Sequence, residues 1–155
     1  GTDMRAVLIG SGRLQGKLKE QAQARGVSAQ ICFAGAVDDE TLRNLYCACE
    51  FFTFPSISAS EAFGMVQLEA MAAGRPVINT WLPTSVPDVS LDGVTGLTVP
   101  PRDVTALRAA MLRLWTNDRL RERFALAALA RVRDRFEQSR VRAALVALYD
   151  EIIEA

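Results

Sequence analysis

The chain has 155 residues, of which half are hydrophobic and 23% are charged, and its 18 basic and 18 acidic residues give a formal net charge of zero. A chain of this length can bury the core of one domain, so we expect residues 1–155 to form a single domain. The zero net charge argues against nucleic acid as the main partner. The absence of histidine excludes Ser–His and Cys–His hydrolases and zinc sites with histidine ligands.

The sequence shows neither an uncharged apolar stretch near the roughly 20 residues that a membrane-spanning helix needs nor the pattern of a signal peptide. Its three cysteines, Cys32, Cys47 and Cys49, have apolar neighbours. The spacing of Cys47 and Cys49 does not suit a zinc or redox pair. We interpret all three as small core residues in a reducing compartment and expect a cytoplasmic protein.

The secondary structure expected from the sequence alternates strands and helices. Apolar runs predict strands at residues 4–9, 30–33, 51–54, 76–79 and 96–99, and glycine or proline closes each of them except 76–79. Apolar residues at helical spacing predict helices at 14–25, 38–49, 64–73, 104–116, 119–135 and 139–154, with Asp38 as an N-cap and a long loop at 80–92. This order predicts an α/β fold, with a parallel sheet covered by helices on both faces.

Two patterns suggest other ligands but fit them poorly. Gly10 and Gly12 resemble the start of a dinucleotide-binding fingerprint, but the third glycine is Gly16, one position too late. We expect these glycines to allow a tight turn and close backbone approach at the carboxyl end of a strand. The arginines of residues 113–142 alternate with apolar residues, which indicates solvated helix faces rather than a surface for nucleic acid.

Glu61 and Glu69 are the most informative residues. Glu61 precedes the helix predicted at 64–73, and Glu69 lies inside it. Because this helix is otherwise nearly all apolar, we expect it to be buried, and a buried carboxylate needs a partner or a ligand. The helix N-terminus offers unpaired N–H groups, and Gly64 would let an anion approach them. The pattern therefore favours a site for a phosphorylated sugar, although Glu69 could instead be satisfied by donors within the protein, or both glutamates could lie on the surface.

A longer string surrounds these glutamates. Residues 61–78 read EAFGMVQLEAMAAGRPVI after the pair Pro55-Ser56, and further matching segments are LIGSG at 8–12, FAG at 33–35, DGVTGL at 92–97 and VPP at 99–101. In this order and over nearly the whole chain, they resemble the carboxyl-terminal, donor-binding domain of the family 4 (group 1) retaining glycosyltransferases, which have the GT-B fold. The resemblance implies a Rossmann-like, three-layer α/β/α domain with a parallel sheet that binds a nucleoside-diphosphate sugar.

The resemblance also implies roles for the two glutamates. Glu61 would lie against the donor sugar near its anomeric centre, where a carboxylate stabilises an oxocarbenium-like state. Glu69 would accept hydrogen bonds from the ribose hydroxyls. The reaction would be a retaining hexosyl transfer to a glycan or lipid-linked acceptor in surface polysaccharide synthesis, in a bacterial protein, without a metal or other cofactor.

Backbone groups complete the site that the resemblance implies. The N–H groups after the first glutamate would hold sugar hydroxyls and the diphosphate, and the main chain of Val37, after the FAG segment, would meet the base. The donor-binding residues expected in this way are Gly10, Val37, Phe63, Gly64, Met65 and Val66. The donor would be GDP-mannose or a UDP-hexose, and the sequence leaves the choice between them open.

The sequence departs from the family pattern at three places. The family usually has a glycine-containing pair in the loop near Thr84-Ser85, and Asp88 stands where related sequences often have glutamate or an aromatic residue. The Arg and Lys that neutralise the diphosphate, together with the first strand and the acceptor domain, are not in this sequence. We therefore expect a fragment that is inactive alone and meets its acceptor through the absent amino-terminal domain. In the full-length protein, peripheral attachment to the inner membrane face stays an open alternative.

The absent first strand would be central in a doubly wound sheet. An unpaired strand edge is a liability, so we expect strands 4–9 and 51–54 to pair directly or a second copy of the chain to form a homodimer. Two alternatives to the enzyme remain. One is a non-catalytic domain of the same fold that binds a nucleotide-sugar or a partner, and the other is a GT-B epimerase, which the absence of histidine disfavours.

Overall fold

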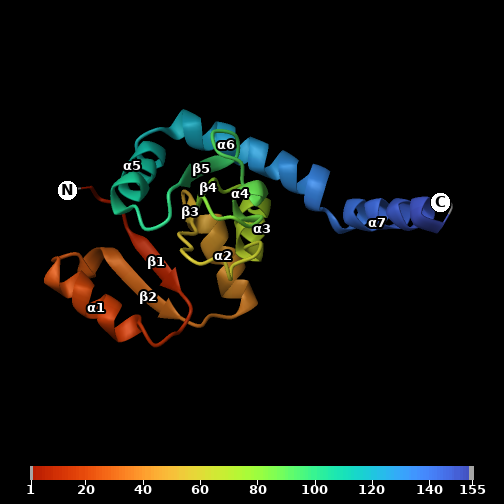
Figure 1. Ribbon diagram of the computed structural model, residues 1–155. Helices are drawn as coiled ribbons and strands as arrows, with labels where there is room; N and C mark the ends of the chain where they lie inside the picture. Colours follow the sequence, from red (N-terminus) through yellow and green to blue (C-terminus); the bar gives the residue numbers. More distant parts are fainter. Residues whose placement is uncertain (1, 154–155) are drawn as a thin grey trace. The chain divides into compact units, whose positions relative to one another are not determined.

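The computed structural model describes residues 2–153, which form helices and parallel strands (Figure 1). They divide into two compact units, with the boundary between Asn44 and Leu45. Each unit has its own parallel sheet, so the expected α/β class with parallel strands is confirmed. Whether the two units act together as one nucleotide-sugar-binding domain stays a prediction.

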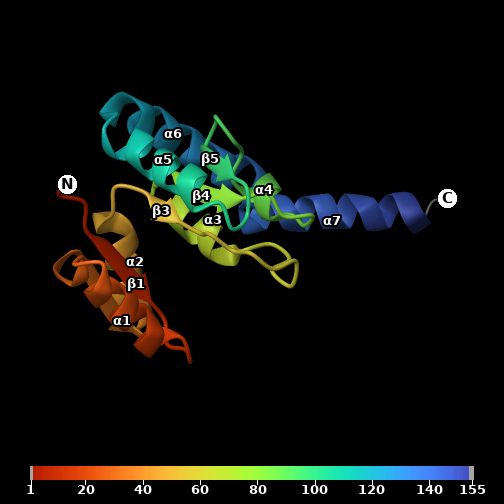
Figure 2. The ribbon, with the colours of Figure 1, turned by 60° about the vertical axis from the view of Figure 1, so that its left-hand side comes forward.

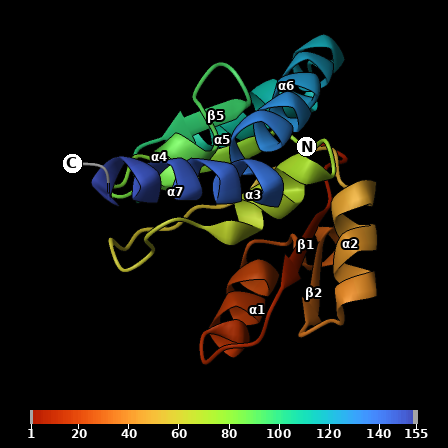
Figure 3. The same cartoon turned by 90° about the vertical axis from the view of Figure 1, so that its right-hand side faces the viewer.

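The first unit contains β1 (Ala6–Ile9), α1 (Gln15–Ala24), a 3₁₀ turn (Ser28–Gln30), β2 (Ile31–Gly35) and the start of α2 (Asp39–Ala48). Figure 3 shows β1 and β2 side by side, and their parallel register runs from Ala6 opposite Ile31 to Ile9 opposite Gly35. Asp38 caps α2 as expected, because its Oδ1 accepts a hydrogen bond of 2.7 Å from the Thr41 amide. This contact lowers the pKa of Asp38.

The second unit has the strand order β3-β4-β5, with every pair parallel. Its elements are β3 (Phe52–Thr53), α3 (Met65–Ala72), β4 (Val77–Thr80), α4 (Val86–Val89), β5 (Gly96–Val99), α5 (Val104–Trp115), α6 (Asp118–Arg131), a π-helical turn (Val132–Phe136) and α7 (Gln138–Ile153). All four residues of β4 are buried, as expected for a central strand. The end predicted for the last helix, Glu154, lies outside the described residues.

The core of the second unit joins its sheet to α5 and α6, which run side by side (Figure 2). It consists of buried residues from both strands and helices: Ile78, Leu97, Val99, Ala110, Leu114, Leu120 and Phe124. Both helices begin with a side-chain cap, since Asp103 accepts a hydrogen bond from the Ala106 amide and Asn117 accepts one from the Leu120 amide. Local capping and apolar burial thus agree on where these helices start.

Three expectations about the elements are wrong. The segment at 80–92 is not all loop, because Pro87 fits the first turn of α4, and Val86 and Val89 are fully buried on it. The helix predicted at 119–135 ends at Arg131 and continues as the π-helical turn. Direct pairing of strands 4–9 and 51–54 does not occur, since β1 pairs with β2 and β3 pairs with β4. A two-residue β3 offers few backbone groups for a second ladder, and the homodimer alternative stays a prediction.

The cysteines are not the core residues that their apolar neighbours suggested. Cys32 and Cys47 are exposed and Cys49 is partly buried, and all three are free. Cys32 lies on the more exposed of the two alternating faces of β2. Burial raises the pKa of Cys49. Among residues 2–153, no helix has both the length and the apolar character needed to cross a membrane.

Candidate functional site

A tight turn carries Glu61 to the N-terminus of α3. Its Oε1 accepts a hydrogen bond of 3.0 Å from the Gly64 amide. Gly64 has a left-handed φ of +77°, and a Cβ there would lie 2.7 Å from a ring carbon of Phe54 and 2.8 Å from Gln67 Nε2. Only glycine fits this position without displacing its neighbours. The Gly64 amide, which we expected to be free for a ligand, is therefore already engaged by Glu61.

One side of α3 is exposed, contrary to the expectation of an entirely buried helix. Met65 is 62% exposed, and Glu69 and Ala72 on the same face are also exposed, whereas Ala70 and Met71 are fully buried. The exposed positions are spaced i, i+4 and i+7, so they form one stripe along the helix. Hydrophobic residues occur on both sides of α3, which is why composition alone could not show that one side is open.

The first turn of α3 has free hydrogen-bond donors. Within residues 2–153, the amides of Met65 and Val66 have no hydrogen-bond acceptor, as expected for the first residues of a helix. Met65 is exposed and Val66 is partly buried. These two N–H groups and the positive end of the helix dipole can bind an anion. Phe63, which precedes Gly64 and also belongs to the predicted set of backbone contacts, is partly buried.

Tyr46 orients Glu69 from the end of α2. The Tyr46 hydroxyl donates a hydrogen bond of 3.0 Å to Glu69 Oε2, and its ring packs edge-on against Phe52 with centroids 5.5 Å apart. Burial and the Glu69 carboxylate raise the pKa of Tyr46, so the phenol stays protonated and remains a donor. Glu69 thus has one hydrogen-bond donor from the protein, as one of our alternatives allowed. Because Glu69 is also exposed, its carboxylate can contact a ligand as well.

A buried polar network fixes the segment that faces α3. Asn79 of β4, which is fully buried, donates to Gln67 Oε1 at 2.9 Å, to the Val86 carbonyl at 3.0 Å and to the Ser90 carbonyl at 3.1 Å. Its Oδ1 accepts a bond of 2.7 Å from the Thr98 hydroxyl. Every polar atom of this side chain therefore has a partner, which specifies one arrangement of α3, β4, β5 and α4.

Gln67 completes this network from the buried side of α3. Its Nε2 donates to the Phe63 carbonyl at 3.1 Å and to the Val86 carbonyl at 3.3 Å. The Ser85 amide donates to the Ala62 carbonyl at 3.0 Å, which links the start of α4 to the turn of Glu61. The network therefore holds the turn and α4 in one arrangement. Sequence reasoning missed Gln67 and Asn79. Their side-chain amides, one in an apolar helix and one in an apolar strand, could have indicated a buried hydrogen-bond network, because buried polar groups need partners.

The predicted site residues fall in both units. Glu61, Phe63, Gly64, Met65, Val66 and Glu69 lie together at and beyond the start of α3. Gly10 and Val37 belong to the first unit, where they follow β1 and β2. Gly10 has a φ of +112°, its amide donates to the Gly35 carbonyl at 2.7 Å, and the space where its Cβ would stand is empty. The positive φ suits glycine, whereas the tight turn, the close backbone approach and the donor-binding roles of all these residues stay predictions.

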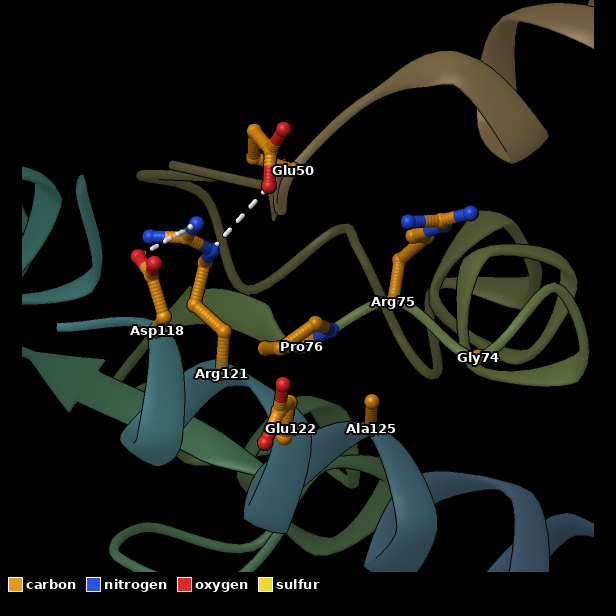
Figure 4. Close-up of a pocket in the computed structure, with 8 residues that line it drawn as sticks. All are labelled: Glu50, Gly74, Arg75, Pro76, Asp118, Arg121, Glu122 and Ala125. Carbon is orange, nitrogen blue, oxygen red and sulfur yellow. Dashed lines mark ion pairs between the residues drawn. The ribbon is translucent and has the colours of Figure 1, made fainter.

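Within the described residues, no three Cys, Asp or Glu side chains gather as ligands for a metal ion. The second unit also has a cavity of about 240 Å³ beside α6 (Figure 4), and neither Glu61 nor Glu69 lines it. It is lined by Glu50, Gly74, Arg75, Pro76, Asp118, Arg121, Glu122 and Ala125. Arg121 pairs there with Glu50 at 3.1 Å and with Asp118 at 2.9 Å, and it donates to the Leu114 and Trp115 carbonyls. These contacts close the end of α5 and indicate a structural role.

Comparison with known proteins identifies the family. The model of the family described as "Glycosyl transferases group 1" matches residues 1–131. The chain belongs to the group 1 glycosyltransferases. The match covers both predicted glutamates and every predicted backbone contact, and it ends where α6 ends.

Two curated relatives of this chain are named as sugar transferases. The chain is 34% identical over 149 residues to the O-antigen chain mannosyltransferase C of Escherichia coli, covering 96% of this chain and 40% of the relative. It is 39% identical over 136 residues to the D-rhamnosyltransferase WbpZ of Pseudomonas aeruginosa, covering 88% of this chain and 35% of the relative. The chain therefore spans less than half the length of the curated relatives it matches.

Solved structures of glycosyltransferases share the fold of this chain. Sucrose-phosphate synthase from Thermosynechococcus elongatus superposes with a TM-score of 0.82 at 26% identity, over 96% of this chain and 38% of that protein. Anabaena Alr3699/HepE, solved in complex with UDP, gives a TM-score of 0.85 at 22% identity, over 96% of this chain and 41% of that protein. The chain thus has the fold of GT-B glycosyltransferase carboxyl-terminal domains, as the resemblance implied.

Proposed function

We propose that this chain is the donor-binding part of a retaining glycosyltransferase that transfers a hexose from a nucleoside diphosphate to a glycan or lipid-linked acceptor of a surface polysaccharide. The observation that carries the proposal is the open first turn of α3. There, two unpaired amides, Met65 and Val66, follow Glu61 and precede Glu69 in the sequence. Amides at a helix N-terminus suit a phosphate, and carboxylates suit sugar hydroxyls.

Glu69 is the proposed ribose ligand. Tyr46 occupies its Oε2 at 3.0 Å, and the residue is exposed on the open side of α3, so its other oxygen can accept hydrogen bonds from a diol. The fixed phenol also limits the directions in which the carboxylate can point. A ribose that meets this group would place its diphosphate toward the first turn of the same helix.

Glu61 is the proposed catalytic residue. Because its Oε1 is held by the Gly64 amide, the carboxylate stays at the start of α3, where the donor sugar would lie beyond the diphosphate. An anion at this point stabilises positive charge on an oxocarbenium-like sugar. The leaving diphosphate would gain negative charge as the glycosidic bond breaks, and the amides of Met65 and Val66 would stabilise that charge. This division of roles needs neither histidine nor a metal.

The proposed donor is a GDP- or UDP-hexose. The named relatives include a mannosyltransferase and a D-rhamnosyltransferase, and HepE was solved with UDP, which supports a nucleoside diphosphate without selecting the base. The O-antigen relative supports a surface polysaccharide as the product. The acceptor would be met largely by parts of the longer relatives that this chain does not cover.

Calorimetric titration with GDP, UDP and ADP tests the donor site. We expect one nucleotide to bind, and Glu69→Gln to weaken that binding by about 1–3 kcal/mol, the usual loss when a charged hydrogen-bond acceptor is removed. Glu122→Gln is the matched control, since Glu122 is an exposed glutamate elsewhere in the second unit. Equal losses in both variants, or no binding of any nucleotide to the wild type, would contradict the proposal for this chain. Nucleotide binding without sugar transfer by a longer protein containing it would favour a non-catalytic domain.

A further inference from the structure

The segment that ends α6 reaches back to the candidate site. Arg131 is the last residue of α6, and the π-helical turn Val132–Phe136 follows it. The Arg131 Nε donates a hydrogen bond of 2.9 Å to the Val89 carbonyl, and its Nη2 donates to the Asp88 carbonyl. These are the last two carbonyls of α4, so the guanidinium closes the C-terminal end of that short helix.

Phe136 extends the same contact to the turn of Glu61. Its ring lies 5.4 Å from the Arg131 guanidinium carbon, and it meets the ring of Phe63 edge-on, with centroids 6.0 Å apart at an angle of 78°. Both separations lie within the ranges at which cation–π and aromatic pairs attract. Phe63 stands directly before Gly64, so the π-helical turn contacts the backbone that leads into α3.

Arg131 and Phe136 therefore hold two segments that meet each other. The Ser85 amide at the start of α4 donates to the Ala62 carbonyl in the turn of Glu61, at 3.0 Å. Arg131 fixes the far end of α4, and Phe136 fixes the turn through Phe63. A displacement of the guanidinium would release the end of α4, and with it the segment that positions the turn.

We propose that Arg131 and Phe136 are positioning residues for the donor diphosphate, acting through the arrangement of α4 and the turn of Glu61. The inference rests on the proposed function and deepens it, since it adds residues that support the open first turn of α3 without contacting the donor. Partial burial, together with the neighbouring Arg135, lowers the pKa of Arg131, but an arginine stays charged. Its hydrogen bonds go to two carbonyls, which separates this role from that of a direct phosphate ligand.

The test separates the diphosphate from the nucleoside. Affinities for UDP and uridine, and for GDP and guanosine, are measured for the wild type, Arg131→Met, Arg131→Lys and Phe136→Leu. We expect the affinity for the nucleoside diphosphate to fall about tenfold in all three variants and the nucleoside affinity to change less than twofold. Lysine keeps the charge but cannot donate as a planar fork to both carbonyls, so it should not restore binding. Arg133→Met is the control, because Arg133 is exposed in the π-helical turn that follows Arg131, and this substitution removes the same charge as Arg131→Met.

Amide hydrogen exchange gives a readout that needs no ligand. We expect faster exchange at the amides of Gly64 and Ser85 in Arg131→Met than in Arg133→Met, with unchanged exchange in α5. An unchanged ratio of UDP to uridine affinity, or unchanged exchange at these two amides, would overturn the inference. If the wild type binds no nucleotide, the proposed function fails, and positioning of a diphosphate fails with it; the exchange data then show only whether Arg131 holds α4.

Discussion

The buried side chain of Asn79 allows the strongest stability prediction. It donates to the Gln67 side chain and to the carbonyls of Val86 and Ser90, and it accepts from the Thr98 hydroxyl. Asn79→Ala removes all four bonds. The Val86 carbonyl keeps a bond from Gln67, and the partly buried Thr98 can turn to water. The change therefore leaves two buried acceptors, Gln67 Oε1 and the Ser90 carbonyl, without a hydrogen bond.

An unpaired buried acceptor costs about 1–3 kcal/mol, so two of them predict a loss of roughly 2–6 kcal/mol in the free energy of unfolding. That is a large share of the about 5–15 kcal/mol by which a typical domain is stable. The matched variant is Thr98→Val, which leaves a single buried acceptor, Asn79 Oδ1, unpaired and is therefore expected to lose about 1–3 kcal/mol. The difference between the two variants measures how much of the network depends on Asn79.

Equilibrium unfolding in urea, followed by tryptophan fluorescence, provides the assay. The two tryptophans of the sequence, Trp81 and Trp115, both lie in the second unit, so the signal reports the unit that contains Asn79. If Asn79→Ala lowers the free energy of unfolding no more than Thr98→Val does, the reasoning is refuted, because the unpaired acceptors would then have found new partners. Unchanged stability in both variants would show that the network contributes nothing net to folding.

Three further changes test other parts of the structure. Gly96→Ala should destabilise the fold more than Gly93→Ala in urea unfolding, because the new Cβ would stand 1.8 Å from the Val77 carbonyl oxygen of β4. Alanine at Gly93 meets no atom within 4 Å and costs only the strain of the left-handed φ of +69°. Equal losses would contradict the close approach of the two strands. The pKa of Tyr46 is raised in the fold, so the stability that its protonated hydroxyl contributes is present below the unfolded pKa of about 10 and is lost as the pH rises above it. Above pH 10 the free energy of unfolding of the wild type should therefore fall more steeply than that of Tyr46→Phe. Parallel curves of stability against pH for the two proteins would count against this. Asn117→Ala should lower stability by about 1 kcal/mol through loss of the α6 cap, and a loss within error of zero would argue against that cap.

The local features of the fold were accessible from the sequence. Apolar runs located all five strands of the described residues, four of them closed by glycine or proline, and β5 at Gly96–Val99 has the predicted bounds. The cap at Asp38 was predicted because N-capping depends on neighbouring residues alone. The string around Glu61 and Glu69 indicated the family, and the family model confirms it. These signals are local because each depends on backbone geometry and side chains a few residues apart.

Only the tertiary structure decided which groups meet across the chain. Helical spacing could not show that α3 leaves Glu69 exposed and covers Gln67, because apolar residues surround both. Nor could it show that Tyr46, 23 positions away, donates to Glu69, or that Arg131, more than 40 positions beyond α4, closes that helix. Such contacts depend on the packing of whole elements, and a hydrogen bond between distant residues leaves no periodicity in the sequence. The sequence by itself therefore determined the elements and the family, whereas the contacts of Tyr46, α4 and the π-helical turn after α6 with α3 and its turn determined how the candidate site is held.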